Sequence, residues 1–255
     1  MTAAALSDVS RTAIGVVRAR AAESARPDRL FDDPFAHGFL DAAGVEGREL
    51  APALQLHVAV RTRFYDDQLR AAGCRQVVLL GAGLDTRAYR LDWPDGATLF
   101  ELDLPPLLSL KEALLVQAGA EPRCRRVALG VDLRDAWDVP LLAAGFEPAV
   151  PTAWLAEGLL VYLDEAAAGH VLTTATALSA AGSRLACEGA RLGTTSTQAA
   201  GEVAQLWRGG LGGDLPAWLH AHGWRTATSS LAELARAYGR SGADAATSTF
   251  LAAER

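Results

Sequence analysis

Apolar residues change their spacing near residue 75, and the two parts of the chain predict different secondary structure. Before this point the pattern is helical and no stretch has the signal of a strand. Asp33-Pro34 is typical of a helix start, a capping residue followed by a first-turn proline, and this segment stops near Gly44. A longer helix is predicted over residues 54–72, closed by Gly73.

After residue 75, strand and helix patterns alternate. Val77-Val78-Leu79-Leu80 is continuously apolar, as expected for a strand of a parallel sheet that helices cover on both faces. Strands are predicted at 76–81, 97–102, 126–131, 152–157 and 183–188, with helices at 84–90, 105–118, 136–144 and 164–181. Two further strands, 223–228 and 247–252, flank a helical stretch at 231–238. The pattern indicates an α/β fold.

Length and composition fit one large domain. The chain has 255 residues, half of them apolar, so we expect a helical cap region at residues 1–73 and a core at 74–255 in a single structural unit. A net charge of −6 without any basic run argues against nucleic acid or an anionic membrane as partner. Neither a leader nor roughly 18 consecutive apolar residues is present, so we expect a cytoplasmic protein.

Cysteines and histidines give no sign of a metal site. Cys74, Cys124 and Cys187 are odd in number and lack metal-ligand spacing, so buried thiols are expected. No pair of histidines has zinc-ligand spacing with a third ligand nearby. We therefore expect no metal.

A glycine turn follows the first predicted strand. Gly81-Ala82-Gly83 lets the backbone approach a ligand closely, although a tight turn without a ligand would have the same sequence. The dinucleotide fingerprint requires a third glycine at position 86, which is Thr86 here. This departure argues against a pyrophosphate at the turn.

Carboxylates occur at the ends of the next three strands. Glu101 and Asp103 follow Gly81 by 20 and 22 residues, the spacing of an acid that accepts ribose hydroxyls in NAD and S-adenosylmethionine sites. Asp132 could take an adenine amine or cap the helix after it. Glu157 lies in an apolar run where an unpaired charge is costly, so we expect a cationic partner: a ligand ammonium or a buried arginine.

Taken together, these motifs resemble the leucine carboxyl methyltransferase and polyketide O-methyltransferase family of S-adenosylmethionine-dependent enzymes. The resemblance rests on residues 81–87, 101–105, 132–133 and 157–163, on Arg61-Thr62-Arg63 and Asp32-Asp33-Pro34-Phe35-Ala36 upstream, and on Gly223-Trp224 downstream. It implies a Rossmann-like class I methyltransferase fold, with a seven-stranded, mostly parallel sheet, an antiparallel last strand and an N-terminal helical cap.

The resemblance also implies a binding site for S-adenosyl-L-methionine. Arg61 would bind the cofactor carboxylate, Asp103 the ribose and Glu157 the ammonium, with Glu101 as a weaker, supporting candidate. The complete predicted set is Arg61, Gly81, Ala82, Gly83, Asp85, Glu101, Asp103, Leu104, Asp132, Leu133, Glu157 and Gly158.

Helical phase separates Arg61 from Arg63. Two residues correspond to about 200° of rotation, so the two side chains face opposite sides. Arg61 lies on the apolar stripe with Val58 and Tyr65, whereas Arg63 lies four residues before Asp67 on a polar face. We expect Arg61 to face the site, unless its long side chain reaches past the stripe to water.

The predicted activity is methyl transfer to an oxygen, carboxylate or hydroxyl, of a small or polyketide-like metabolite. No histidine or lysine lies by motif beside the glycine turn or Glu157, which favours a carboxylate that needs no base. If there is a base, His220 and His222 are the candidates, and Trp207 and Trp218 are candidates to line an acceptor site. Two alternatives remain: an NAD-dependent oxidoreductase and a non-catalytic protein that binds an adenosyl ligand.

Overall fold

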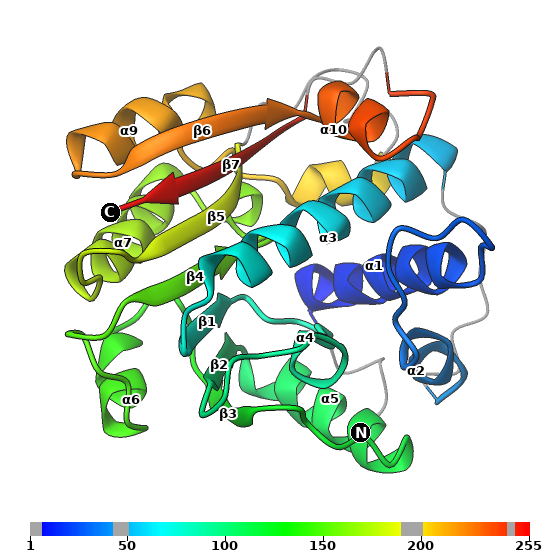
Figure 1. Cartoon of the computed structure of the whole chain (residues 1–255), viewed down its shortest axis with the longest axis horizontal. Coiled ribbons are helices and arrows are strands. Elements are labelled where there is room, and N and C mark those ends of the chain that lie inside the picture. The colour runs from blue at the N-terminus through cyan, green and yellow to red at the C-terminus, as the bar shows by residue number, and fades with distance from the viewer. Residues whose placement is uncertain (1–6, 43–50, 190–200, 244–247) are drawn as a thin grey trace.

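A seven-stranded sheet forms the centre of the protein (Figure 1). The computed structural model describes residues 7–42, 51–189, 201–243 and 248–255. In sheet order the strands are β3 (Arg125–Gly130), β2 (Thr98–Asp103), β1 (Gln76–Leu80), β4 (Thr152–Ala156), β5 (Arg184–Gly189), β7 (Thr249–Glu254) and β6 (Arg225–Ser230). β1 to β5 are parallel, and β7 is antiparallel to β5 and β6. The predicted sheet, including its antiparallel last strand, is confirmed.

Strand positions agree with the sequence pattern to within two residues. The largest shifts are in the last two strands, each of which begins two residues later than predicted; residue 247 itself lies outside the described residues. β6 has only one apolar residue, Ala227, among four Ser and Thr, so its ends are weakly marked in the sequence.

The helices also follow the predicted order. They are α1 (Asp8–Ser24), α2 (Ala36–Ala42), α3 (Pro52–Ala72), α4 (Arg87–Arg90), α5 (Pro105–Gln117), α6 (Asp138–Ala143), α7 (Glu165–Ala177), α9 (Leu215–Ala221) and α10 (Leu231–Ala237), with short 3-10 helices η2 (Leu160–Tyr162), η3 (Gly201–Leu206) and η4 (Gly212–Asp214). α4 is shorter than predicted because residues 84–86 form the turn after β1. α3 ends where Gly73 adopts the left-handed conformation, at φ 59°.

The second helix begins later than its sequence suggests. Asp33 was the expected cap, but the helix starts at Ala36, because Asp33 bends the chain before it by accepting a hydrogen bond from the Phe35 amide. The carboxylate of Asp33 is buried and forms an ion pair with Arg20 of α1 at 3.0 Å. The predicted end near Gly44 lies outside the described residues.

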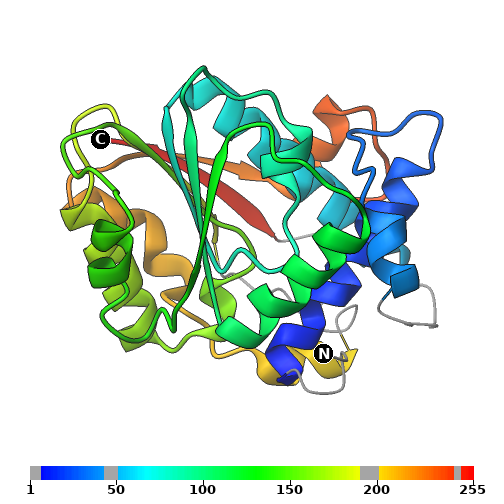
Figure 2. The same ribbon diagram turned by 90° about the horizontal axis from the view of Figure 1, so that it is seen from below.

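Helices cover both faces of the sheet (Figure 2). Val77 and Leu79 of β1 belong to a buried cluster with residues of α1, α3, α5 and α10. Val78 and Leu80 belong to a second cluster with residues of α6, α7 and α9. The alternation of side chains along one continuously apolar strand thus serves both faces, and the N-terminal helices share a core with the sheet.

The chain order creates a crevice at the carboxyl edge of the sheet. β1 pairs with β2 on one side and with β4 on the other, so the connections leave β1 in opposite directions. In open α/β sheets, ligands bind at this reversal. β7 approaches the same edge from the other direction, because Thr249 at its start pairs with Gly189 at the end of β5.

Candidate active site

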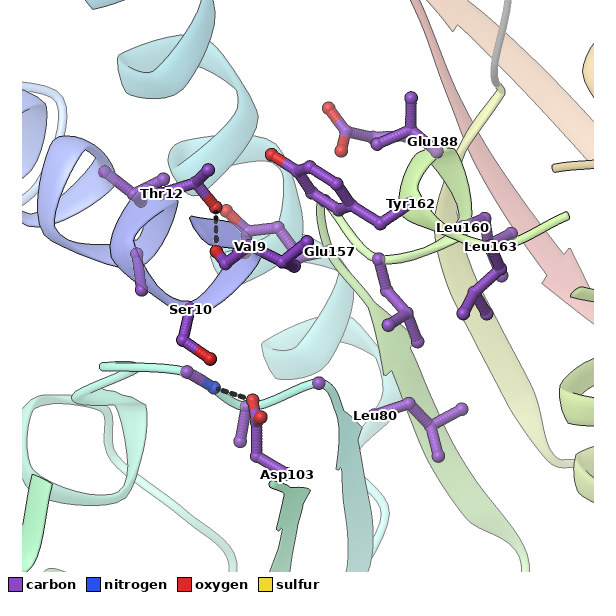
Figure 3. Close-up of a pocket in the computed structure, with 18 of the residues that line it drawn as sticks. Val9, Ser10, Thr12, Leu80, Asp103, Glu157, Leu160, Tyr162, Leu163 and Glu188 are labelled. Carbon is purple, nitrogen blue, oxygen red and sulfur yellow. Dashed lines mark hydrogen bonds between the residues drawn. The ribbon is translucent and has the colours of Figure 1, made fainter. Parts of the chain in front are cut away.

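One cavity of about 1070 Å³ lies at this carboxyl edge. Its walls come from the ends of β1, β2, β4 and β5, from α1 and α3, and from the segment after β4 that contains η2 (Figure 3). Every residue of the predicted cofactor set except Glu101 lines it. α1 is held over the glycine turn by Arg20, which donates a hydrogen bond to the Leu84 carbonyl at 2.6 Å.

The glycine turn brings bare backbone to the cavity wall. Gly81 and Gly83 have φ values of 68° and 48°, in the region that favours glycine. A Cβ on Gly81 would come within 3.0 Å of a methyl carbon of Leu159. The amides of Gly81 and Ala82 both donate to the Leu102 carbonyl, at 2.9 and 3.0 Å, so the end of β2 fixes the turn.

Asp103 joins the turn to the tip of β2. One carboxylate oxygen accepts from the Gly83 amide and the other from the Leu104 amide, each at 2.6 Å. Burial raises the pKa of Asp103, while the two amides oppose that rise. Each oxygen keeps a lone pair for a further donor, so the carboxylate can accept two hydroxyl groups from a ligand in the cavity.

Glu101 does not line the cavity, so its place in the predicted cofactor set is wrong. Its side chain is completely buried between Lys111 and Arg126, with both N–O distances 2.7 Å. Strand alternation places Glu101 and Asp103 on the same face of β2, but only Asp103 lies at the strand end. Glu101 lies two residues deeper, under α5, where it neutralises the buried Lys111.

Glu157, at the tip of β4, connects two arginines. Its oxygens lie 2.9 Å from Arg61 Nε and 2.7 Å from Arg87 Nη1. Arg87 is almost completely buried and also forms ion pairs with Asp66 and Asp85. The sequence predicted a cationic partner for Glu157, either a ligand ammonium or a buried arginine. The structure supplies buried arginines, Arg61 and Arg87.

Arg87 was not singled out from the sequence, although it lies four residues after Gly83. Although burial favours the protonated form of Asp85, Arg87 lowers the pKa of Asp85 to about 2. Arg87 thus keeps Asp85 ionised and holds the Glu157 side chain in place.

The two arginines of α3 face different surroundings. Arg61 lines the cavity and is 8% exposed, and its Nη1 lies 3.4 Å from Glu188 of β5. Arg63 does not line the cavity; it pairs with Asp67 at 2.9 Å and donates to the Leu30 carbonyl. Helical phase therefore assigned the faces correctly, and the role of Arg61 in binding stays a prediction.

A histidine does lie beside the site, contrary to the sequence interpretation. His57 lines the cavity, and its Nε2 is 3.0 Å from Oε1 of Glu188. Although burial favours the protonated form of Glu188, Arg61 and the hydrogen bond with His57 lower the pKa of Glu188 to about 2. The signal was available: His57 lies four residues before Arg61, one helical turn away on the same face.

The comparisons with known proteins identify the family. A sequence model described as "Leucine carboxyl methyltransferase" matches residues 13–176. The chain belongs to the leucine carboxyl methyltransferase family. It is accordingly an S-adenosylmethionine-dependent methyltransferase.

Two bacterial relatives carry the name "Putative S-adenosyl-L-methionine-dependent methyltransferase". The one from Parafrankia sp. is 51% identical, over 85% of this chain and 77% of the relative. The one from Streptomyces avermitilis is 42% identical, over 92% of this chain and 89% of the relative.

Among solved structures, a "putative methyltransferase" from Thermobifida fusca superposes with a TM-score of 0.60 at 16% identity, covering 93% of this chain and 94% of the other. Magnesium protoporphyrin IX methyltransferase from Synechocystis gives 0.53 at 16% identity, covering 87% and 94%. These likenesses show the fold, which is that of class I methyltransferases.

The cavity of the methyltransferase has the groups that its methyl donor requires. The donor carries ribose hydroxyls, an adenine amine and a zwitterionic amino-acid tail. Carboxylates stand at the tips of β2 and β4 and just after β3, and Arg61 supplies a cation beside Glu157. The donor set therefore fits the cofactor in number and in sign of charge.

Asp132 is also occupied by a neighbour in the methyltransferase. Its carboxylate accepts from the Arg134 amide at 3.0 Å and pairs with the Arg134 side chain. The helix-capping alternative is wrong, because α6 begins only at Asp138, after Trp137, and Asp132 bonds within the turn before it. Asp132 and Leu133 both line the cavity.

Of the four residues expected at the acceptor site, only one lines the cavity. Trp207 lines the cavity, whereas Trp218, His220 and His222 do not. Trp218 instead stacks on the His222 ring at 3.7 Å between centroids. The histidines proposed as candidate bases therefore lie away from the site.

Two kinds of feature are absent from the described ranges. Those ranges contain no group of three or more His, Cys, Asp or Glu side chains that could hold a metal ion. In the same part of the chain, no helix combines the length and apolarity that crossing a bilayer requires. Cys74 and Cys187 are buried and Cys124 is half-buried, all as free thiols.

Proposed function

We propose that the methyltransferase transfers the methyl group of S-adenosylmethionine to an oxygen, carboxylate or hydroxyl, of a small and largely apolar metabolite. The observation that carries this proposal is the cavity at the carboxyl edge, which all of the predicted cofactor set except Glu101 lines and which extends beyond it. A volume of about 1070 Å³ is at the upper end for one drug-sized ligand. It is large enough for a cofactor with an acceptor beside it.

The cofactor roles follow from the chemistry of each group. We assign the ribose hydroxyls to Asp103, the adenine to Asp132 and Leu133, and the amino-acid tail to the glycine turn with Arg61 and Glu157. The cofactor, when bound, supplies a methyl group that a sulfonium already activates. The protein then needs mainly to align the acceptor oxygen and exclude water.

The part of the cavity beyond these residues is mostly apolar. Val9, Ala13 and Val16 of α1 line it, together with Leu160 and Val161 of the η2 segment. An apolar acceptor is favoured because these side chains would gain from its burial. A large or highly charged acceptor is disfavoured.

Ligand binding tests the proposal most directly. Calorimetric titration of the full chain with S-adenosylhomocysteine should show one site per chain, and NAD should show no binding. A crystal of that complex should have the ribose at Asp103. Binding of NAD, or an adenosyl group bound outside this cavity, would contradict the assignment.

A further inference from the structure

The pair formed by His57 and Glu188 has no role in the cofactor assignment above. Both side chains line the cavity and are 19% exposed. Nε2 of His57 is taken by Glu188, and no hydrogen bond joins Nδ1 to any residue that the structure describes. The cavity is thus lined by a histidine whose Nδ1 has no partner among the described residues and whose Nε2 contacts an ionised carboxylate.

The surroundings of His57 hold the ring in place. Phe250 of β7 packs against it, with centroids 5.5 Å apart, and Glu188 of β5 fixes its other edge. Arg61, one turn along α3, contacts Glu188 and Glu157. The charged groups facing His57 are therefore one guanidinium and the two carboxylates that it bridges, and Glu188 alone touches the ring.

We propose that His57 is the general base of the methyl transfer and that the acceptor oxygen is a hydroxyl, phenolic or alcoholic, and not a carboxylate. This inference rests on the proposed O-methyltransferase function. It replaces the preference for a carboxylate, whose premise was that no base lies near the glycine turn. Glu188 is the positioning residue, which orients the ring and offsets the charge that it gains.

The step balances in atoms and charge. The acceptor oxygen forms a bond to the methyl carbon while the carbon–sulfur bond breaks, and sulfur keeps that electron pair as a neutral thioether. The hydroxyl proton passes to Nδ1 of His57, either directly or through one water. The imidazolium that results is hydrogen-bonded to the Glu188 carboxylate.

The charge of the cavity supports a neutral acceptor independently of His57. The carboxylates that line it are Asp85, Asp103, Asp132, Asp164, Glu157 and Glu188, and the guanidinium groups are Arg20, Arg61, Arg134 and Arg208. Arg87, which does not line the cavity, pairs with Asp85 and Glu157, so the carboxylates outnumber the guanidinium groups by six to five. Arg20, Arg61 and Arg134 already have carboxylate partners, and Arg208 lies at the exposed part of the lining. A carboxylate acceptor would enter surroundings of its own sign, whereas a hydroxyl would not.

The test uses two probes that differ only in the reacting group, 2-naphthol and 2-naphthoic acid, with His57→Gln and the matched control His220→Gln. His220 is an exposed histidine outside the cavity. The wild-type chain should convert 2-naphthol to an alkali-stable methyl ether, at a rate that falls as the pH is lowered, because a protonated imidazole cannot take the hydroxyl proton. His57→Gln should lose about a hundredfold or more in rate and lose this pH dependence. His220→Gln should match the wild type.

Binding measurements separate this inference from the function on which it rests. S-adenosylhomocysteine should bind wild type and His57→Gln equally, because His57 has no cofactor role. In the S-adenosylhomocysteine complex, 2-naphthol should bind more tightly than 2-naphthoic acid. His57→Gln should weaken the binding of 2-naphthol and leave that of 2-naphthoic acid unchanged.

Three results would overturn the inference while S-adenosylhomocysteine still binds: methylation of 2-naphthoic acid in preference to 2-naphthol, no methylation of 2-naphthol, or a rate in His57→Gln within twofold of wild type. Failure of S-adenosylhomocysteine to bind the wild type would overturn the proposed function itself.

Discussion

Replacement of Asp103 tests the cofactor site at the residue with the best-defined geometry. Both carboxylate oxygens are already fixed by backbone amides at 2.6 Å, so the two remaining lone pairs point where those amides direct them. A hydrogen bond to a charged group contributes about 1.5–3 kcal/mol. Loss of two such bonds in Asp103→Ala should therefore cost about 3–6 kcal/mol, which weakens binding by about 10² to 10⁴.

The assay is calorimetric titration with S-adenosylhomocysteine, together with thermal unfolding of each variant. Asp103→Asn retains the shape and one acceptor oxygen, so it should fall between wild type and Asp103→Ala. Glu101→Gln is the comparison: it leaves Lys111 and Arg126 short of a buried charge, so it should lower the melting temperature. Its affinity, measured where it is folded, should change much less. If Glu101→Gln weakens binding more than Asp103→Ala does, then Glu101 and not Asp103 holds the ribose.

Three further predictions use single measurements. Arg61→Lys keeps the charge but loses the guanidinium fork, so affinity for S-adenosylhomocysteine should fall about tenfold or more, while Arg63→Lys should stay within twofold; equal losses would show that both residues reach the ligand. The pKa of Glu188 is lowered from 4.5 to about 2, so its ionised form stabilises the fold by about 3 kcal/mol at pH values above 4.5, and this stabilisation is lost as the pH falls from 4.5 toward 2. The melting temperature of wild type should therefore fall more steeply between pH 6 and 3 than that of Glu188→Gln, and parallel curves would refute the assignment. Gly81→Ala forces a side chain into a left-handed conformation and against Leu159, so it should lower stability by about 1–2 kcal/mol or more, whereas Gly38→Ala, in open helical space, should be neutral or stabilising; a neutral Gly81→Ala would mean that the turn can relax.

Much of the fold could be predicted because its strands are strongly patterned. The run from Val77 to Leu80 indicates a strand buried on both faces, and the helices between strands imply parallel crossovers. The order of strands has no local signal. That β7 lies between β5 and β6 depends on pairing between residues some 60 positions apart, such as Leu251 with Cys187, and this was available only through the family resemblance.

The site was predictable where a single element determines it. Strand-end position and helical phase led to Asp103 and Arg61, which line the cavity. The prediction failed where the role of a residue depends on its depth along the strand or on a partner far away in the sequence. Glu101 shares a face with Asp103 but lies under α5, and His57 gains its importance from Glu188, 131 residues away.

The antiparallel course of β7 makes the two ends of the chain unequal for protein engineering. Thr249 begins the strand at the cavity, and Arg255 finishes at the opposite edge of the sheet, where its amide donates to Ser183 just before β5. Six residues of extended strand span roughly 20 Å. At the other end, Ser7, which caps α1, and Ser10 of α1 are themselves part of the cavity wall. A fluorophore or surface tether attached after Arg255 thus stays about a strand length from the ligands, whereas the same group attached at Ser7 would lie in the cavity wall.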